Sequence, residues 1–401
     1  MTPEIYITGC GICSALGIGK EATWEAISRM RSGIGEMHYL ATAHRTLPVG
    51  EVPLDEAELR RRLDIPPDEV STRTELLGRL ALLEAVEESG LGPWLQRDNR
   101  IALISGTTVG GMDKSEMYFR DFLENDTRNA YIATHDCGAC TEMIAAAAGH
   151  FDRITTISTA CSSAANAILT GSAWLRTGQC EVAVVGGSEC ITKFHLNGFR
   201  TLMILDEKPC RPFDASRAGL NLGEGAAYLV LATGPALEKY GMKPLFRLSG
   251  CGNACDAFHQ TASSPEGDGA FLAMQEALRE SGLQPADIGY INAHGTGTPN
   301  NDLSEGLAIE RLFGPSSVPP VSSTKAFTGH TTSASGSIEA VLSLMVLEHQ
   351  QIPVNLRYTR RTEGLSFDAA TSPQPPAGIR HVLSNSFGFG GNDTSCIFSK
   401  L

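Results

Sequence analysis

The chain has 401 residues, of which 42% are hydrophobic, and a formal net charge of -13. This length predicts two or three structural units, or one large duplicated unit, with sizeable cores. The negative charge argues against nucleic acid as a general partner, and no run of eighteen apolar residues is available to span a membrane.

The first residues and the cysteines indicate the compartment. Residues 1–7 lack a basic segment followed by an apolar stretch, so we expect no signal peptide and a cytoplasmic location. The 11 cysteines are scattered and odd in number, which is typical of reduced thiols. The pairs Cys10/Cys13 and Cys137/Cys140 lie too far apart in the sequence for a typical structural zinc site, so no metal is expected.

Segments rich in β-branched residues predict strands in two successive series, with helical patterns between them. This alternation predicts an α/β protein with mostly parallel sheets that are covered on both faces. The glycines of Gly9-Cys10-Gly11 indicate a tight strand-to-helix turn. The predicted strands are Ile5–Thr8, Ile101–Ser105, Ile154–Thr159, Val182–Val185 and Ala227–Leu231, then Phe246–Ser249, Ile288–Asn292, Val318–Ser322 and Cys396–Ser399, and the predicted helices are Thr72–Ser89, Ser163–Thr177, Phe271–Ser281 and Ile338–His349.

The two series follow a similar plan. A strand, a turn of small residues and a long apolar helix occur in order around Cys161, and the same order recurs around His330. Sequence identity between these two stretches is low. We therefore predict a duplicated fold with an N-terminal half at residues 1–240, a C-terminal half at residues 241–401 and a seam near residues 234–243.

Cys161 stands at the junction of a predicted strand and a predicted helix, within Ile157–Asn166. We expect it on the first turn of the helix, where unsatisfied backbone N–H groups and the helix dipole favour a thiolate. Such a thiol is a candidate nucleophile. A buried structural cysteine is the alternative interpretation.

Two histidines follow strand ends further along the chain. His294 comes directly after a strand, and Thr296 and Thr298 offer hydroxyls at alternate positions beyond it. His330 comes shortly after Lys325, whose ammonium group would be costly to bury without a partner. The acids considered as partners of Lys325 are Asp302, Glu305 and Glu339.

A glycine-rich turn within Asn385–Asp393 precedes the final strand. Its backbone N–H groups would form one side of an oxyanion hole, with the N–H of Cys161 as the other side.

In combination these motifs resemble those of the β-ketoacyl-[acyl-carrier-protein] synthases of the elongating type I/II kind, in the thiolase-like superfamily. The resemblance extends over nearly the whole chain. It implies a thiolase-like five-layered α-β-α-β-α fold of two similar halves, and a homodimer or a heterodimer with a related chain. The matching stretches are the Cys161 run, Arg211–Asp214 with Gly223–Gly225, Asp256–His259, and the His294, Lys325/His330 and Phe387–Gly391 motifs.

The resemblance implies a decarboxylative Claisen condensation. Cys161 would take an acyl group from a carrier thioester, and His294 and His330 would donate hydrogen bonds to the malonyl thioester carbonyl as it loses carbon dioxide. The resulting carbanion would attack the acyl group on Cys161, and the N–H groups of Cys161 and Phe389 would hold the tetrahedral oxyanion.

The resemblance also implies supporting roles. Lys325 with Glu339 would orient the second histidine, His330, and its water. Thr296 and Thr298 would bind the phosphopantetheine arm, and Phe389 would gate the acyl pocket. No cofactor is expected, because the substrates are carried on the arm of the carrier protein.

An acyl carrier protein is the partner that this family implies. Candidate basic sites for such an acidic protein are few, and an ordinary solvated surface is the alternative interpretation of each. The candidates are Arg60–Arg62, Lys193, Arg200, Lys208 and Arg211.

The sequence departs from the family in three places. Ser333–Gly336 replaces a usual Gly-Ala-Ala-Gly, Gly390–Asp393 replaces Gly-Gly-Thr-Asn, and the segment before Cys161 is short. We expect these changes to affect the dimer contact, the pocket rim and the acyl-chain preference. The short form resembles synthases of polyene and aryl-polyene pigment clusters.

The sequence differs from two related enzyme classes and leaves one alternative of a different class. A thiolase would carry a second catalytic cysteine in a Cys-x-Gly setting, whereas Cys396 lies on a predicted strand, and an initiating synthase would have Asn in place of His330. A non-catalytic partner that resembles chain-length factors remains the alternative of a different class, although such partners lack the nucleophile.

Overall fold

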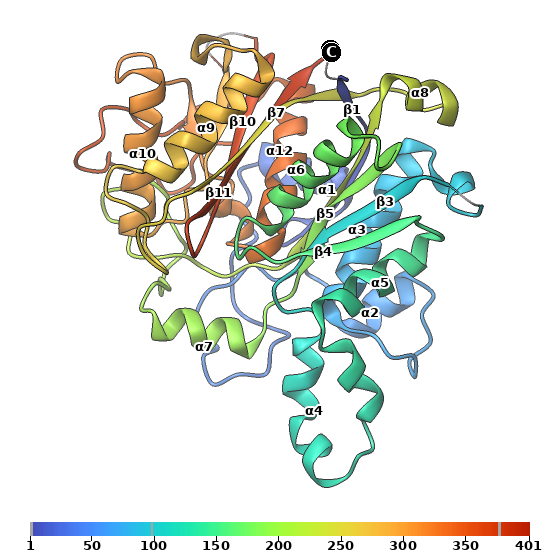
Figure 1. The fold of residues 1–401 in the computed structure, drawn as a ribbon. Coiled ribbons are helices and arrows are strands. Elements are labelled where there is room, and N and C mark those ends of the chain that lie inside the picture. The colour runs from blue at the N-terminus through green and yellow to red at the C-terminus, as the bar shows by residue number, and fades with distance from the viewer. Residues whose placement is uncertain (1–2, 98, 376–377) are drawn as a thin grey trace.

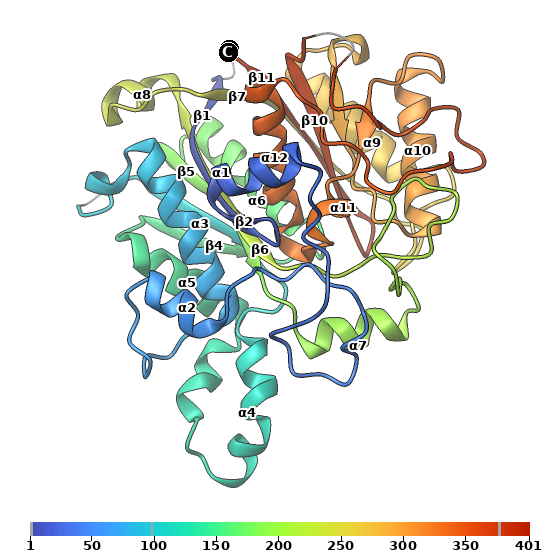
Figure 2. The ribbon, with the colours of Figure 1, turned by 180° about the vertical axis from the view of Figure 1, so that it is seen from behind.

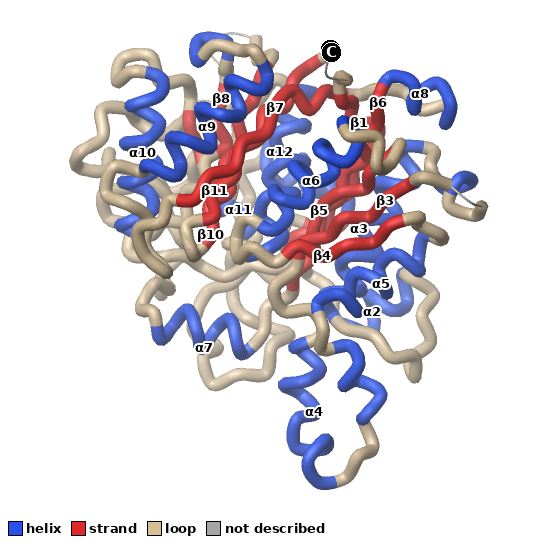
Figure 3. The backbone as a smooth tube through the Cα atoms, in the orientation of Figure 1, coloured by secondary structure: helices blue, strands red, loops and turns tan. Residues whose placement is uncertain are grey.

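Two strand units of the same design meet edge to edge in one continuous sheet (Figures 1 and 3). The computed structural model describes residues 3–97, 99–375 and 378–401. The strands are β1 (Ile5–Ser14), β2 (Gly17–Ile18), β3 (Ile101–Gly106), β4 (Arg153–Ile157), β5 (Val182–Glu189), β6 (Gly225–Thr233), β7 (Phe246–Cys255), β8 (Tyr290–Asn292), β9 (Val321–Ser322), β10 (His381–Gly388) and β11 (Asn392–Lys400).

The strand order reveals the duplication directly. The sheet runs β4-β3-β5-β6-β1-β7-β11-β10-β8-β9, with β2 paired to β1. If β2 is set aside, each half has its third, second, fourth, fifth and first strands in that order, and the antiparallel pair β1–β7 joins the halves. The thiolase-like fold is therefore confirmed, while the boundary at residues 240/241 stays a prediction.

The prediction of mostly parallel sheets is wrong. In each half the third, second and fourth strands are parallel neighbours, but the fourth, fifth and first strands pair antiparallel. Strands that are buried on both faces read as continuous apolar runs whatever their direction, so the pattern does not report direction. The strand β10 covers the first part of the predicted glycine-rich turn and pairs antiparallel with β11.

Helices form three layers around and between the two sheet halves (Figures 1 and 2). α3 and α5 cover the first half, α9 and α10 cover the second, and α6 and α12 pack against each other between them. The helices are α1 (Gly19–Ser28), α2 (Glu56–Arg62), α3 (Arg73–Ser89), α4 (Met112–Glu124), α5 (Cys137–Ala148), α6 (Ser163–Arg176), α7 (Lys193–Thr201), α8 (Gly234–Tyr240), α9 (Asp268–Ser281), α10 (Pro299–Phe313), α11 (Lys325–Thr328) and α12 (Ser335–His349).

The outer helices pack equivalently in the two halves. A Cβ atom on Gly9 or Gly11 of β1 would lie 2.6 or 2.1 Å from backbone oxygens of α3, and the same additions at Gly250 and Gly252 of β7 would lie 2.4 and 2.1 Å from those of α9. Gly9 and Gly11 lie inside a strand and not in a turn, so that prediction is wrong. These glycines are needed because a helix backbone approaches each strand closely.

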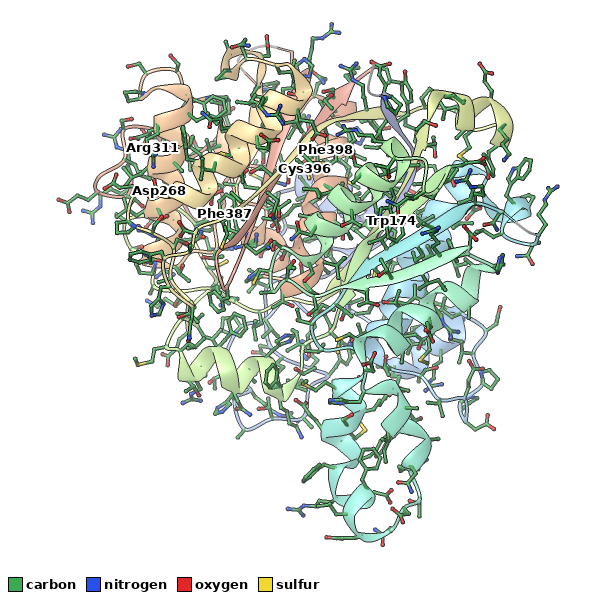
Figure 4. The ribbon with its side chains drawn as sticks, viewed as in Figure 1. Trp174, Asp268, Arg311, Phe387, Cys396 and Phe398 are labelled. Carbon is green, nitrogen blue, oxygen red and sulfur yellow. The ribbon has the colours of Figure 1, made fainter. Side chains whose placement is uncertain are left out.

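An ion pair joins two outer helices of the second half, and one segment projects from the molecule. Asp268 at the start of α9 and Arg311 of α10 form an ion pair of 2.8 Å at the edge of the second half (Figure 4). The segment around α4 projects from the body of the molecule in both views (Figures 1 and 2). Among the described residues, no helix has both the length and the apolar character needed to cross a membrane.

Candidate active site

Cys161 lies between β4 and α6. It stands two residues before α6 and therefore not on its first turn, and its side chain is buried. Ala160 before it has a φ of 51°, a left-handed conformation that is costly for a non-glycine residue and frequent at functional turns. The Ser386 hydroxyl donates to the Cys161 carbonyl at 3.0 Å, which ties this turn to the second half.

His330 occupies the equivalent place in the second half, between β9 and α12. Its Nε2 lies 3.1 Å from the Cys161 Sγ, and its Nδ1 lies 3.0 Å from the Ser335 Oγ. The His294 ring is nearly perpendicular to the His330 ring, with 5.3 Å between ring centroids. The fold thus brings the predicted sulfur and both predicted imidazoles together.

Lys325 lies behind His294. Its Nζ contacts the His294 Nδ1 at 3.1 Å, donates to the His294 carbonyl at 2.7 Å and pairs with Glu339 Oε1. Lys325 therefore supports His294. The resemblance had implied that Lys325 would orient His330 instead. The other Glu339 oxygen is buried without a hydrogen-bond partner among the described residues.

The other two acids considered for Lys325 have different partners. Glu305 accepts the backbone N–H groups of His294 and Gly295, both at 2.8 Å, and so fixes the turn that carries His294. Asp302 accepts the N–H groups of Phe213 and Gly297. Only Glu339 of the three candidates pairs with Lys325.

Burial controls the protonation of the Cys161 thiol and of the two histidines. Desolvation lowers the pKa of His294 and of His330 well below the usual value, and the Lys325 ammonium lowers both further, so both rings are neutral at pH 7. Desolvation also raises the pKa of the Cys161 thiol to about 12, against the lowering effects of Lys325 and of a hydrogen bond from the Phe389 backbone. The expected thiolate stabilisation at a helix start is therefore outweighed by burial in this structure.

A cavity of roughly 310 Å³ opens onto these groups. Lys325 and Glu339 do not line it, since they lie behind His294. Phe389 stacks on Phe199 of α7 at 5.8 Å between centroids, and the Thr296 and Thr298 hydroxyls lie 2.9 Å apart. The wall of this cavity contains six of the predicted site residues, which are Cys161, His294, His330, Thr296, Thr298 and Phe389.

Several residues at the site were not predicted as functional. Ser335, where the family has Ala, contacts His330 directly. Asn392, where the family has Thr, accepts from Ser162 at 2.9 Å and Asn166 at 2.6 Å, so it joins the Cys161 turn to β11. The departures from the family motifs are the sequence signal for these residues, and they lie at the site itself, whereas we expected effects on the dimer contact and pocket rim.

Asp393, where the family has Asn, is 5% exposed and lines the same cavity. Desolvation, together with the neighbouring Asp256 and Glu305 carboxylates, raises the pKa of Asp393 to about 8. A carboxyl group that is largely neutral at pH 7 thus faces the cavity.

Metal ligation has no support in the described part of the chain, where no group of three or more His, Cys, Asp or Glu side chains is arranged to hold an ion. All the cysteines described are free thiols, including Cys10, Cys13, Cys137 and Cys140.

Sequence comparison covers nearly the full chain. Residues 2–235 match the model for the beta-ketoacyl synthase N-terminal domain, and residues 245–359 match the model for the C-terminal domain. The chain is 30% identical to the 3-oxoacyl-[acyl-carrier-protein] synthase 2 of Vibrio harveyi over 99% of both proteins. It is also 30% identical to the protein of that name from Staphylococcus aureus, over 99% of this chain and 98% of that protein.

Solved structures agree with this assignment. One titled the ishigamide ketosynthase/chain length factor has a TM-score of 0.92 at 26% identity, with full coverage of both chains. A ketosynthase in complex with its chain length factor from Xenorhabdus doucetiae has a TM-score of 0.80 at 30% identity, over 100% of this chain and 98% of that one. The chain therefore belongs to the beta-ketoacyl synthase family of acyltransferase-class enzymes.

Proposed function

We propose that this protein catalyses the decarboxylative condensation of an acyl group on Cys161 with a malonyl thioester carried on acyl carrier protein, as part of fatty-acid, polyene or polyketide-type chain elongation. The observation that carries the proposal is the 3.1 Å contact between Cys161 Sγ and His330 Nε2, with the His294 ring beside it in one cavity. The proposed reaction takes place in the cytoplasm and uses no metal or cofactor other than the carrier arm.

The first half-reaction is acyl transfer. The sulfur of Cys161 attacks the carrier thioester, the carrier thiol leaves, and the thiol proton passes to the leaving sulfur. The N–H groups of Cys161 and Phe389 hold the tetrahedral oxyanion, and the loss of one such donor costs about 2.7–4 kcal/mol in the transition state.

The second half-reaction is decarboxylation and condensation. The two neutral imidazoles donate hydrogen bonds to the malonyl thioester oxygen as the bond to the carboxylate breaks, carbon dioxide leaves and an enolate forms. The enolate carbon then attacks the acyl carbonyl, and the Cys161 sulfur leaves as a thiolate that takes up a proton from water to restore the thiol. Thr296 and Thr298, on the cavity wall, bind the carrier arm in this proposal.

The acidic acyl carrier protein is proposed to dock beside α7. Phe199 of α7 lines the cavity, while Lys193 and Arg200 lie on the same helix and Lys208 is exposed in the segment that follows it. Arg60–Arg62 is a poorer candidate, since Arg60 is buried and Arg61 and Arg62 pair with Glu58.

A dimer, with a second copy or with a related chain, is proposed to form along β4. This strand ends the sheet, and Ile154 on it is 42% exposed. An open edge strand with an exposed apolar side chain readily pairs with another chain. Met117, Phe119 and Leu123 of the projecting α4 are also exposed. Light scattering of the purified protein would give a monomer mass if this proposal is wrong.

Acyl transfer and carbon dioxide release are the direct tests. The protein is incubated with acyl-carrier protein, and mass spectrometry of its peptides is expected to show the acyl group on Cys161. Addition of malonyl-carrier protein is then expected to release carbon dioxide and yield the β-ketoacyl product. A non-catalytic chain-length-factor-like partner would show neither when assayed alone, and its Cys161 would stay unacylated when it is mixed with a related active synthase.

A further inference from the structure

The two histidines at the cavity differ in what contacts their outer nitrogen. Lys325 Nζ lies 3.1 Å from the His294 Nδ1. An ammonium group can only donate hydrogen bonds, so this Nδ1 accepts and the proton of the neutral ring resides on Nε2. The tautomer of His294 is therefore fixed by Lys325.

The outer nitrogen of His330 meets a hydroxyl group. Its Nδ1 lies 3.0 Å from the Ser335 Oγ, which lies 3.2 Å from the Thr331 Oγ1. A hydroxyl both donates and accepts, so contact with Ser335 alone permits either ring tautomer. The three side chains are buried, which makes an unsatisfied polar hydrogen here costly.

We propose that Ser335 is a positioning residue that donates to the His330 Nδ1 and so holds the proton of this ring on Nε2. This inference rests on the proposed function, because it makes both imidazoles N–H donors toward one thioester oxygen. In this arrangement Thr331 donates to Ser335, Ser335 donates to Nδ1, and Nε2–H points at the Cys161 Sγ 3.1 Å away. All donors of this row then point in one direction, toward the cavity.

The opposite direction would place a bare Nε2 at the cavity. The ring would then donate from Nδ1 to Ser335 and accept the Cys161 thiol proton, and it could not stabilise an enolate oxygen by donation. Ser335 is the first residue of α12, where the positive end of the helix dipole disfavours a proton on the adjacent Nδ1. The resemblance led us to expect Ala at this position, so the serine hydroxyl is one of the departures of this chain from the family motif.

The tautomer is tested directly by ¹⁵N NMR of the histidine rings in the full-length protein, since protonated and bare imidazole nitrogens differ widely in chemical shift. We expect His330 to show a protonated Nε2 and a bare Nδ1 in the unsubstituted protein. Ser335→Ala is expected to shift both His330 nitrogens toward intermediate values and to leave those of His294 unchanged. A bare Nε2 in the unsubstituted protein, or unchanged His330 shifts in Ser335→Ala, would overturn the proposal.

Ser337→Ala is the matched control. Ser337 is another buried serine of α12, and its hydroxyl donates to the Ala334 carbonyl at 3.2 Å without contact to a histidine. It is expected to leave the His330 shifts unchanged. Thr331→Val keeps the shape of Thr331 and removes its hydroxyl, and it is expected to produce a smaller shift than Ser335→Ala.

Kinetics supply a second readout. Ser335→Ala is expected to lower kcat for condensation by roughly 2- to 12-fold, the usual effect of one neutral hydrogen bond, with little change in KM for the carrier-bound substrate. An equal fall in kcat for Ser337→Ala would contradict a positioning role. If the protein has no condensation activity but shows the expected tautomers, the proposed function fails and the inference about Ser335 stands.

Discussion

The two halves of the molecule place different chemistry at equivalent positions. α6 and α12 are the long helices that come after the third strand of each half, α12 after the short helix α11, and the segments that lead into them carry Cys161 and His330. The first half thus supplies the sulfur, while the second supplies both imidazoles and the charged pair behind one of them. A duplicated scaffold has kept its packing and diverged at the turns, because turns contribute little to the cores and face the central cavity.

The largest expected effect is the loss of acyl transfer when the Cys161 sulfur is removed, while decarboxylation at the two imidazoles continues. Cys161→Ala is expected to abolish acyl transfer, since no other group accepts the acyl chain in the proposed mechanism. It is expected to retain carbon dioxide release from malonyl-carrier protein, because the histidine donors remain. Mass spectrometry and carbon dioxide assays measure the two steps separately. Acylation at another cysteine in this variant would contradict the assignment of acyl transfer to Cys161 in the first half.

Substitution of either histidine in the second half tests the decarboxylation step. His294→Ala or His330→Ala each removes one hydrogen-bond donor to the enolate, and each is expected to slow decarboxylation by about 10²- to 10³-fold. Acylation of Cys161 is expected to be affected much less. Normal carbon dioxide release in both variants would contradict the roles given to the histidines.

The buried pair behind His294 is expected to matter for stability. Lys325→Met leaves Glu339 buried without its partner, and the loss of one member of such a pair lowers the free energy of unfolding by about 3–5 kcal/mol. The double variant Lys325→Met/Glu339→Leu removes both charges and is expected to regain much of that loss. Urea unfolding of the single and double variants measures the difference, and equal stabilities would show that the pair is not coupled.

The pH dependence of stability reports on Asp393, which lies on β11 and lines the cavity. Its pKa is raised from 3.8 to about 8 by burial, so its neutral form is favoured in the folded state. The stability contribution is fully present below about pH 4 and is lost as the pH rises toward 8. Relative to Asp393→Asn, the unsubstituted protein is expected to lose unfolding free energy over this range. Parallel stability curves for the two proteins would show that Asp393 does not titrate as described.

The smallest expected effect concerns carrier docking. Lys208→Glu is expected to raise KM for acyl-carrier protein about 2- to 5-fold at low salt, because single exposed charges contribute little and are screened. KM for a free pantetheine thioester is expected to stay the same. Lys243→Glu is the matched control, since Lys243 is exposed between α8 and β7, at the opposite end of the molecule from α7 (Figure 1). Equal effects of the two substitutions would argue against docking at α7.

The duplication was inferred from the weaker of two sequence signals. The stretches around Cys161 and His330 have little in common, whereas Ala81–Pro93 and Ala273–Pro285 share Ala, Glu-Ala, Glu-Ser-Gly-Leu and Pro at matching positions. These are the helix ends that pack on Gly9 and Gly11 and on their counterparts in β7, and the glycines Gly90 and Gly282 that end the two helices both have a φ of 70°. The similarity of these two stretches follows from the close packing of helix on strand in both halves. The stretches around Cys161 and His330 differ because they carry different functional groups.

The sequence by itself determined the family, and it predicted Cys161, His294, His330 and the cavity threonines as site residues, because each lies in a short motif after a strand whose residue types carry the chemistry. It did not determine strand direction, the choice of Glu339 among three acids, the side on which Lys325 acts or the contact of Ser335 with His330. Those depend on how α12 and the turns after β8 and β9 pack around one cavity. Burial, which only the tertiary structure decides, also sets the protonation of Cys161, His294, His330 and Asp393, since the cost of a buried charge depends on every group that surrounds it.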